Sequence, residues 1–177
     1  MRIILPLLIL LVSAAAVFAV QKMTYAAKVE AFGDSKLVPA GLAKRVLERK
    51  PVKSVKDLAI KLDRLTPKGR QVYRNPVVWP LDVWYAVAIA VALASWSWTI
   101  AAYGGFWPLP LLIAPLVYLL ADWTEGWLLS NVLALDPQQM TEESYRSIRA
   151  ATTMKLAFLL ASPAQAPLVL LLSRVIQ

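Results

Sequence analysis

The feature that most constrains this chain is the alternation of long apolar segments with one strongly basic segment. Apolar residues dominate 1–20 and then three further stretches, at about 77–103, 109–135 and 151–172. An α-helix needs about 20 predominantly apolar residues to cross a bilayer. The whole chain is 59% hydrophobic with a mean hydropathy of +0.57, whereas soluble domains are about 45–50% apolar. The sequence therefore predicts an all-α, membrane-embedded four-helix bundle.

The first apolar segment has two interpretations. Arg2 precedes it, and Val17-Phe18-Ala19 carries the small residues that a signal-peptide cleavage site needs. Its run of about 18 apolar residues is long for the core of a signal peptide and long enough to span a bilayer. We therefore expect residues 1–20 to form a retained first transmembrane helix that acts as a signal anchor, with cleavage as the alternative.

Residues 21–75 form the basic segment. They hold fourteen Lys or Arg and five Asp or Glu, a net charge of +9, which exceeds the +8 of the whole chain. Because Lys and Arg near membrane ends stay cytoplasmic, we expect this segment in the cytoplasm and both termini on the non-cytoplasmic side of a bacterial inner membrane. The charge then reflects topology, and no nucleic-acid partner is expected. Residues 41–49 and 54–65 predict short amphipathic helices, within a solvated linker or lying on anionic lipid.

Residues 76–177 predict a transmembrane region of three helices. A tight turn around Gly104 and Gly105 makes the second and third spans antiparallel neighbours. A polar loop at 136–150 then returns the chain to the cytoplasmic side, with a cap at Thr141 for a short helix leading into the last span. Two prolines, at 163 and 167, are expected to kink that span.

Four ionisable side chains lie within the predicted spans: Asp82, Asp122, Glu125 and Lys155. Charged residues cost several kcal/mol at the bilayer centre and by default signal pairing or function. With a rise of about 1.5 Å per residue, all four fall in the cytoplasmic third of the membrane. We interpret them as one polar intramembrane cluster, in which Asp122 and Glu125 share a helix face.

This cluster has a structural and a functional interpretation. In the structural one, Lys155 neutralises Asp122 or Glu125, and Arg149 or Thr152 helps to satisfy the remaining polar atoms. In the functional one, the crowded carboxylates bind a proton or a cation, or the layer binds a lipid head group. The possible head-group contacts are Arg70, Arg74, Arg146 and Arg149.

The composition removes several chemistries. The chain has no Cys and no His, so thiolate metal sites, a cysteine nucleophile and the commonest general base are excluded. Asp122 also lacks the flanking glycine of intramembrane aspartyl proteases. We therefore expect no catalytic residues, no metal ligands and no cofactor.

A pattern of spaced residues extends from Gly69 to Lys155. The positions are Gly69, Arg70, Tyr73, Asp82, Asp122, Glu125, Thr152 and Lys155. The pattern, GRxxY, then D, then DxxE, then TxxK, resembles a group of small bacterial polytopic membrane proteins, although Gly126 stands where that group has Asn. The resemblance implies a four-helix membrane fold and one constellation of the four intramembrane charges. It implies no activity.

These observations lead to one expected function and two alternatives. We expect a non-catalytic polytopic membrane protein, an accessory or scaffold subunit of a larger membrane complex, in contact with membrane lipids and other membrane protein subunits. Alanines at alternate positions of the second span permit close helix packing. The first alternative is a small carrier or a proton- or cation-handling protein that uses Asp122, Glu125 and Lys155. The second is a membrane enzyme that acts on lipid.

Overall fold

The computed structural model describes residues 4–33, 53–104, 107, 109–135 and 139–176. Within these ranges the chain forms helices and their connections, and no strand. The helices are α1 (Ile4–Ala31), α3 (Val55–Asp63), α4 (Pro67–Val72), α5 (Val83–Gly104), α6 (Ile113–Ala134) and α7 (Glu142–Ile176), with a short 3-10 turn at Leu109–Leu112. The all-α helical bundle predicted from the sequence is confirmed.

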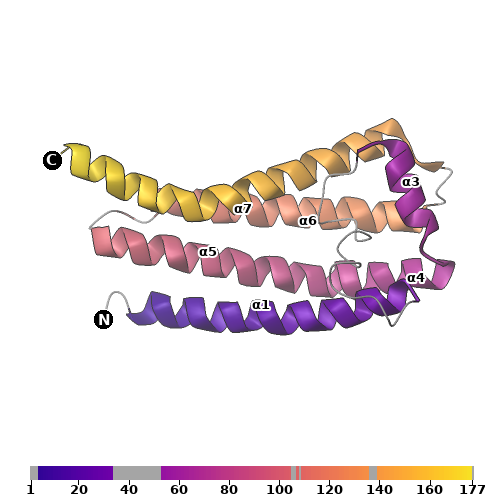
Figure 1. Cartoon of the computed structure of the whole chain (residues 1–177), viewed down its shortest axis with the longest axis horizontal. Helices are drawn as coiled ribbons and strands as arrows, with labels where there is room; N and C mark the ends of the chain where they lie inside the picture. Colours follow the sequence, from indigo (N-terminus) through magenta and orange to yellow (C-terminus); the bar gives the residue numbers. More distant parts are fainter. Residues whose placement is uncertain (1–3, 34–52, 105–106, 108, 136–138, 177) are drawn as a thin grey trace.

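The four long helices run alternately in opposite directions in the order α1, α5, α6, α7 (Figure 1). The start of α1 and the end of α7 therefore lie at one end of the bundle, and α3 and α4 lie at the other. Helix α5 packs against α1, α6 and α7, and α6 packs extensively against α7. Helix α1 joins the bundle through α5 and through the chain around α4.

Three helical stretches in the described part of the chain are long and apolar enough to cross a membrane. They are Ile4–Ala31, Pro67–Ala102 and Leu109–Ala134. The expected fourth span, 151–172, falls inside α7 and stays a prediction. Large apolar side chains are exposed along all four long helices, as lipid-facing surfaces require. The exposed set includes every Trp of the chain: Trp79, Trp84, Trp96, Trp98, Trp107, Trp123 and Trp127.

Helix α1 continues well past residue 20, where its apolar stretch was expected to end. The sequence from 21 to 31 contains no Pro or Gly, so nothing in it interrupts the helix. The helix ends at Ala31, and Gly33, with its positive φ of 63° and its amide hydrogen bond to the Glu30 carbonyl (2.9 Å), closes a C-terminal turn. Hydropathy therefore marks the apolar part of the helix, whereas glycine marks its end.

The chain at Tyr73–Asp82, which leads into the regular helix of the second span, is not regular helix itself. Asn75 (φ −143°, ψ 113°) and Trp79 (φ −135°, ψ 121°) are extended within Tyr73–Asp82. Each precedes a proline, and the proline ring disfavours helical backbone in the residue before it. Regular helix in this part of the chain starts at Val83.

Helix α7 is one long helix rather than a short helix followed by a span. The predicted cap at Thr141 is confirmed, because its Oγ1 accepts a hydrogen bond from the Ser144 amide (3.1 Å). Glu142 and Glu143 occupy the first turn, where their negative charges interact favourably with the helix dipole and stabilise the helix. Figure 1 shows α7 changing direction in its C-terminal half, which contains Pro163 and Pro167.

The main apolar core lies at the end of the bundle that carries α3 and α4. The expected amphipathic helix at 54–65 is confirmed: Ser54 caps α3, and Leu58 and Leu62 are buried. They pack with residues from α1, α6 and α7, among them Ala31, Leu129 and Ile148. The other expected amphipathic helix, 41–49, lies outside the described residues.

The Gly-Arg-x-x-Tyr element ties α4 to its neighbours. A Cβ on Gly69 would lie 2.2 Å from the Ala31 carbonyl oxygen, so only glycine permits this approach of α4 to α1. The Arg70 guanidinium donates to the Leu135 carbonyl at the end of α6 (3.4 Å). Tyr73 is buried, with its ring edge-to-face against Phe32 (centroids 6.0 Å apart).

We predict that Gly69→Ala lowers the free energy of unfolding by roughly 1–3 kcal/mol, because backbone of α1 must move to admit the new methyl group. Gly126→Ala is the matched control, since a Cβ there meets only Val78 at an ordinary 3.7 Å, and alanine favours the helix. Thermal unfolding in detergent measures both. Equal midpoints for the two variants would contradict the proposed close packing.

A buried ionic cluster between helices α6 and α7

Two pairs of residues, each three apart, face one another across the contact between α6 and α7. Asp122 and Glu125 lie on α6, and Thr152 and Lys155 lie on α7. Lys155 Nζ donates to Asp122 Oδ1 (3.0 Å) and to Glu125 Oε2, and Thr152 Oγ1 donates to Glu125 Oε1. The two helices run antiparallel, so that Lys155 faces both carboxylates of α6 and Thr152 faces Glu125. We call these four residues the ionic cluster.

The ionic cluster is closed off from solvent. Glu125 and Thr152 are each 1% exposed, Asp122 is 6% exposed and Lys155 is 7% exposed. Tyr118, one turn before Asp122 on α6, is also buried. Charges this deep are tolerated only when they are paired and hydrogen-bonded, and the contacts of Lys155 and Thr152 provide that pairing.

Asp82 approaches the ionic cluster from a third element. It ends the segment before α5 and is half-buried. It lies close enough to the Lys155 ammonium and to Tyr118 to act on both electrostatically. The structure therefore brings Asp122, Glu125 and Lys155 into direct contact, with Asp82 within electrostatic range of Lys155.

The two helper residues expected for this cluster behave differently. Thr152 does bond to Glu125. Arg149 instead donates its Nη1 hydrogen to the Tyr145 hydroxyl oxygen (2.8 Å), one turn nearer the start of α7. Lys155 is thus the cation that the structure gives to the two carboxylates of α6.

The four arginines considered as head-group contacts fall into two pairs. Arg70 bonds to backbone carbonyls, and Arg74 Nε donates to Ser130 Oγ on α6 (3.0 Å). Arg146 forms an exposed ion pair with Glu142 (3.3 Å). Arg146 and Arg149 both line an open groove between α3 and α7. The first pair thus reinforces the fold, and the second pair borders the groove.

A second polar contact, which the sequence analysis missed, lies toward the other end of the bundle. Gln165 of α7 donates to the Leu111 carbonyl oxygen and lies 3.5 Å from Ser97 Oγ on α5. Ser97 is fully buried. The signal available in the sequence was the polar amide of Gln165, which lies between Pro163 and Pro167 in an otherwise apolar segment. This contact ties α7 to α5 and to the turn before α6.

In the described part of the chain, no three Asp, Glu, His or Cys side chains gather so as to hold a metal ion. Comparisons of the chain with protein-family models, curated proteins and solved structures find no match. The resemblance to small bacterial membrane proteins therefore stays a prediction. What the arrangement of side chains supports chemically is a buried ion-pair network between two helices.

We predict that Lys155→Met destabilises the bundle by roughly 3–5 kcal/mol, because it leaves two buried carboxylates without their shared cation. Lys68→Met is the matched control, since Lys68 is exposed on α4. The midpoints of thermal unfolding of the two purified variants measure the difference. An equal midpoint for both would show that Lys155 does not hold the helices together.

Proposed function

We propose that this chain is a non-catalytic membrane protein that serves as an accessory or scaffold subunit of a larger membrane complex. The observation that carries the proposal is the ionic cluster, whose ammonium and hydroxyl groups bond directly to the carboxylates beside them. A catalytic or transport site needs polar groups that meet a ligand. Here the polar groups meet one another, at 1–7% exposure.

The proposed location is a bacterial cytoplasmic membrane. Three apolar helices support a bilayer environment. The basic residues of 53–74 gather at the end of the bundle that carries α3 and α4, which favours a cytoplasmic position for that end. The alternation of the four long helices then puts both termini on the other side. In this orientation the ionic cluster lies nearer the cytoplasmic face.

The position of α1 supports a role in assembly. This helix packs against α5, and large apolar residues along the rest of it are exposed. Examples are Leu5, Leu8 and Val12, each more than half exposed. A helix held from one side offers its other sides to lipid or to helices of a partner subunit. Membrane helices associate through packing of such surfaces.

Proton or cation handling is the second candidate, and one observation favours it. The ionic cluster brings two carboxylates to one ammonium, and Asp82 acts on the same ammonium. Crowded carboxylates in a medium of low dielectric constant favour uptake of a proton or a cation. An enzyme that acts on lipid has less support, because its polar groups would have to open toward the head groups.

We predict that the chain, tagged and extracted from its native membrane in mild detergent, is recovered with other membrane polypeptides at a fixed ratio. Because the protomer is only 19.6 kDa, size-exclusion chromatography with mass measurement resolves a complex from a monomer. The same tag on an unrelated four-helix membrane protein controls for carry-over. Recovery of a stable lone monomer in several mild detergents would contradict the subunit role.

The two candidates also differ in how they respond to Asp122→Asn and Glu125→Gln. For a subunit, we expect less folded protein in the membrane and a proportional loss of any recovered partner. For a proton-handling protein, the amount of folded protein stays constant, whereas proton flux into proteoliposomes is lost. Quantitative fluorescence of a fused reporter, together with a pH-sensitive dye, distinguishes the two outcomes.

A further inference from the structure

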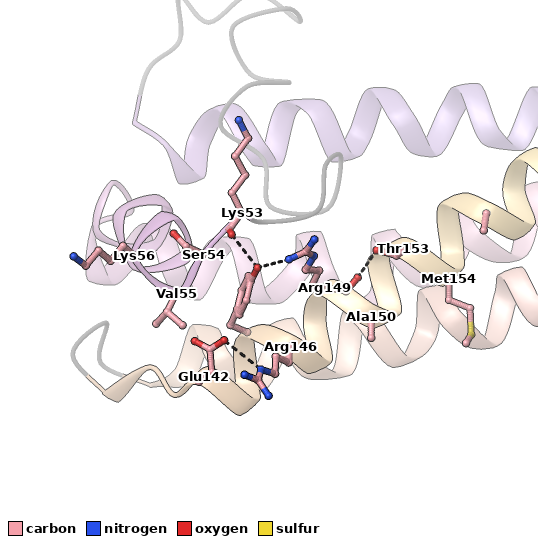
Figure 2. Close-up of a pocket in the computed structure, with 12 residues that line it drawn as sticks. Lys53, Ser54, Val55, Lys56, Glu142, Arg146, Arg149, Ala150, Thr153 and Met154 are labelled. Carbon is pink, nitrogen blue, oxygen red and sulfur yellow. Dashed lines mark hydrogen bonds and ion pairs between the residues drawn. The ribbon is translucent and has the colours of Figure 1, made fainter.

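An open groove lies between the start of α3 and the first half of α7, with a volume of about 1090 Å³. Figure 2 shows the residues that line it. The groove is separate from the ionic cluster: its lining residues on α7 include Arg149, Thr153 and Met154, which are exposed, whereas Thr152 and Lys155 are buried. The structural role of the cluster does not account for it.

One end of the groove is cationic. Its lining includes Lys53, Lys56, Arg146 and Arg149, against the single carboxylate of Glu142. Glu142 is engaged with Arg146 Nε at 3.3 Å. After that pairing, Arg149 remains beside the groove without a carboxylate from its lining, and Figure 2 shows the Lys53 and Lys56 side chains extending outward, away from Arg149. This charge balance favours an anionic occupant.

The Arg149 guanidinium is held in place by a buried tyrosine. Arg149 Nη1 donates to Tyr145 Oη (2.8 Å), and Tyr145 Oη donates to the Lys53 carbonyl oxygen (2.9 Å). Tyr145 is 6% exposed and belongs to the main apolar core, so its ring position is fixed by packing. The dashed lines that reach Lys53 and Arg149 in Figure 2 mark these two hydrogen bonds. A guanidinium held in this way loses less entropy on binding an anion.

The other end of the groove is apolar. Ala150, Met154 and Ala157 recur at helical spacing and line one face of α7. Met154 is 51% exposed although it is a large apolar side chain. Figure 2 shows Ala150 and Met154 farther along α7 than the charged residues. The groove therefore changes from cationic to apolar along α7, in the direction of the apolar part of that helix.

We propose that this groove binds one anionic glycerophospholipid of the cytoplasmic leaflet. The phosphate lies against Arg149, and an acyl chain follows Met154 and Ala157. Arginine presents several donors in one plane to phosphate oxygens, and the apolar face of α7 removes the acyl chain from water. The proposal rests on the proposed membrane location of the bundle and is independent of the subunit role.

The two-part character of the groove selects a lipid over other anions. A free phosphate ester would use the cationic end and leave Met154 exposed to solvent. A nucleic acid or an acidic peptide would gain nothing from an apolar continuation that leads along a membrane helix. An anionic lipid occupies both ends at once.

Native mass spectrometry of the full chain in detergent tests the proposal. Phosphatidylglycerol and phosphatidylcholine with identical acyl chains are titrated separately, and glycerol 3-phosphate serves as the head group alone. We expect phosphatidylglycerol to bind at least tenfold more tightly than phosphatidylcholine, and glycerol 3-phosphate to bind more weakly than phosphatidylglycerol. Arg149→Gln should weaken phosphatidylglycerol binding about tenfold, as expected for loss of a charged hydrogen bond.

Arg64→Gln is the matched control, because Arg64 is exposed at the end of α3 and does not line the groove. It should change the affinity less than twofold. Tyr145→Phe keeps the ring in the core and removes the hydroxyl that holds Arg149, so it should weaken phosphatidylglycerol binding several-fold while the protein remains folded.

Three results would overturn the lipid site. Equal affinity for the two lipids would show that the groove does not select an anionic head group. Equal effects of Arg149→Gln and Arg64→Gln on the affinity would show that the lipid is attracted by the overall positive charge rather than bound at this groove. Tight binding of glycerol 3-phosphate would identify a site for a soluble anion. Recovery of the chain in the membrane fraction tests the proposed location independently of lipid binding, and co-purification tests the subunit role. A failure of the lipid site can therefore be told apart from a failure of either of these proposals.

Discussion

The pairing of Lys155 with Asp122 and Glu125 is the interaction on which the rest of the bundle depends. Burying these charges costs free energy, and only direct pairing with hydrogen bonds offsets the cost. The pairing fixes both the rotation and the register of α6 against α7, because the ammonium reaches both carboxylates only where they face it. Apolar residues of the main core, including Leu129 and Ile148, pack beside the ionic cluster, and α5 then packs against both helices.

The two ends of the bundle are held by different means. At the basic end, α3 and α4 close the bundle over a large apolar core, and Gly69 lets α4 approach the end of α1. Toward the opposite end, the described contacts include a small apolar group and the Gln165 amide, which bridges α7 to the turn before α6. The basic end is therefore the more extensively packed, and it is also the end that borders the groove between α3 and α7.

Hydropathy predicted the helical fold, and the rare charges within the apolar segments drew attention to Asp122, Glu125 and Lys155, because both are strong local signals. The hydrogen-bond partners of individual residues were harder to predict. Arg149 and Thr152 were equal candidates in the sequence, and only the rotation of α7 assigned Thr152 to Glu125 and Arg149 to Tyr145. The groove was not predictable, since its lining joins residues near 53 to residues near 150. The end of α1 was misjudged because composition changes at residue 20 whereas the helix does not end there.

A double-mutant cycle on Glu125→Gln and Lys155→Met tests the central role of the ionic cluster most directly. Unfolding free energies of the parent protein, the two single variants and the double variant give the coupling between these side chains. The structural account predicts that the two losses are strongly non-additive, with a favourable coupling of about 1.5 kcal/mol or more, because removal of either partner leaves the other buried without it. Losses that add to within about 0.5 kcal/mol would show that the pair does not hold α6 to α7.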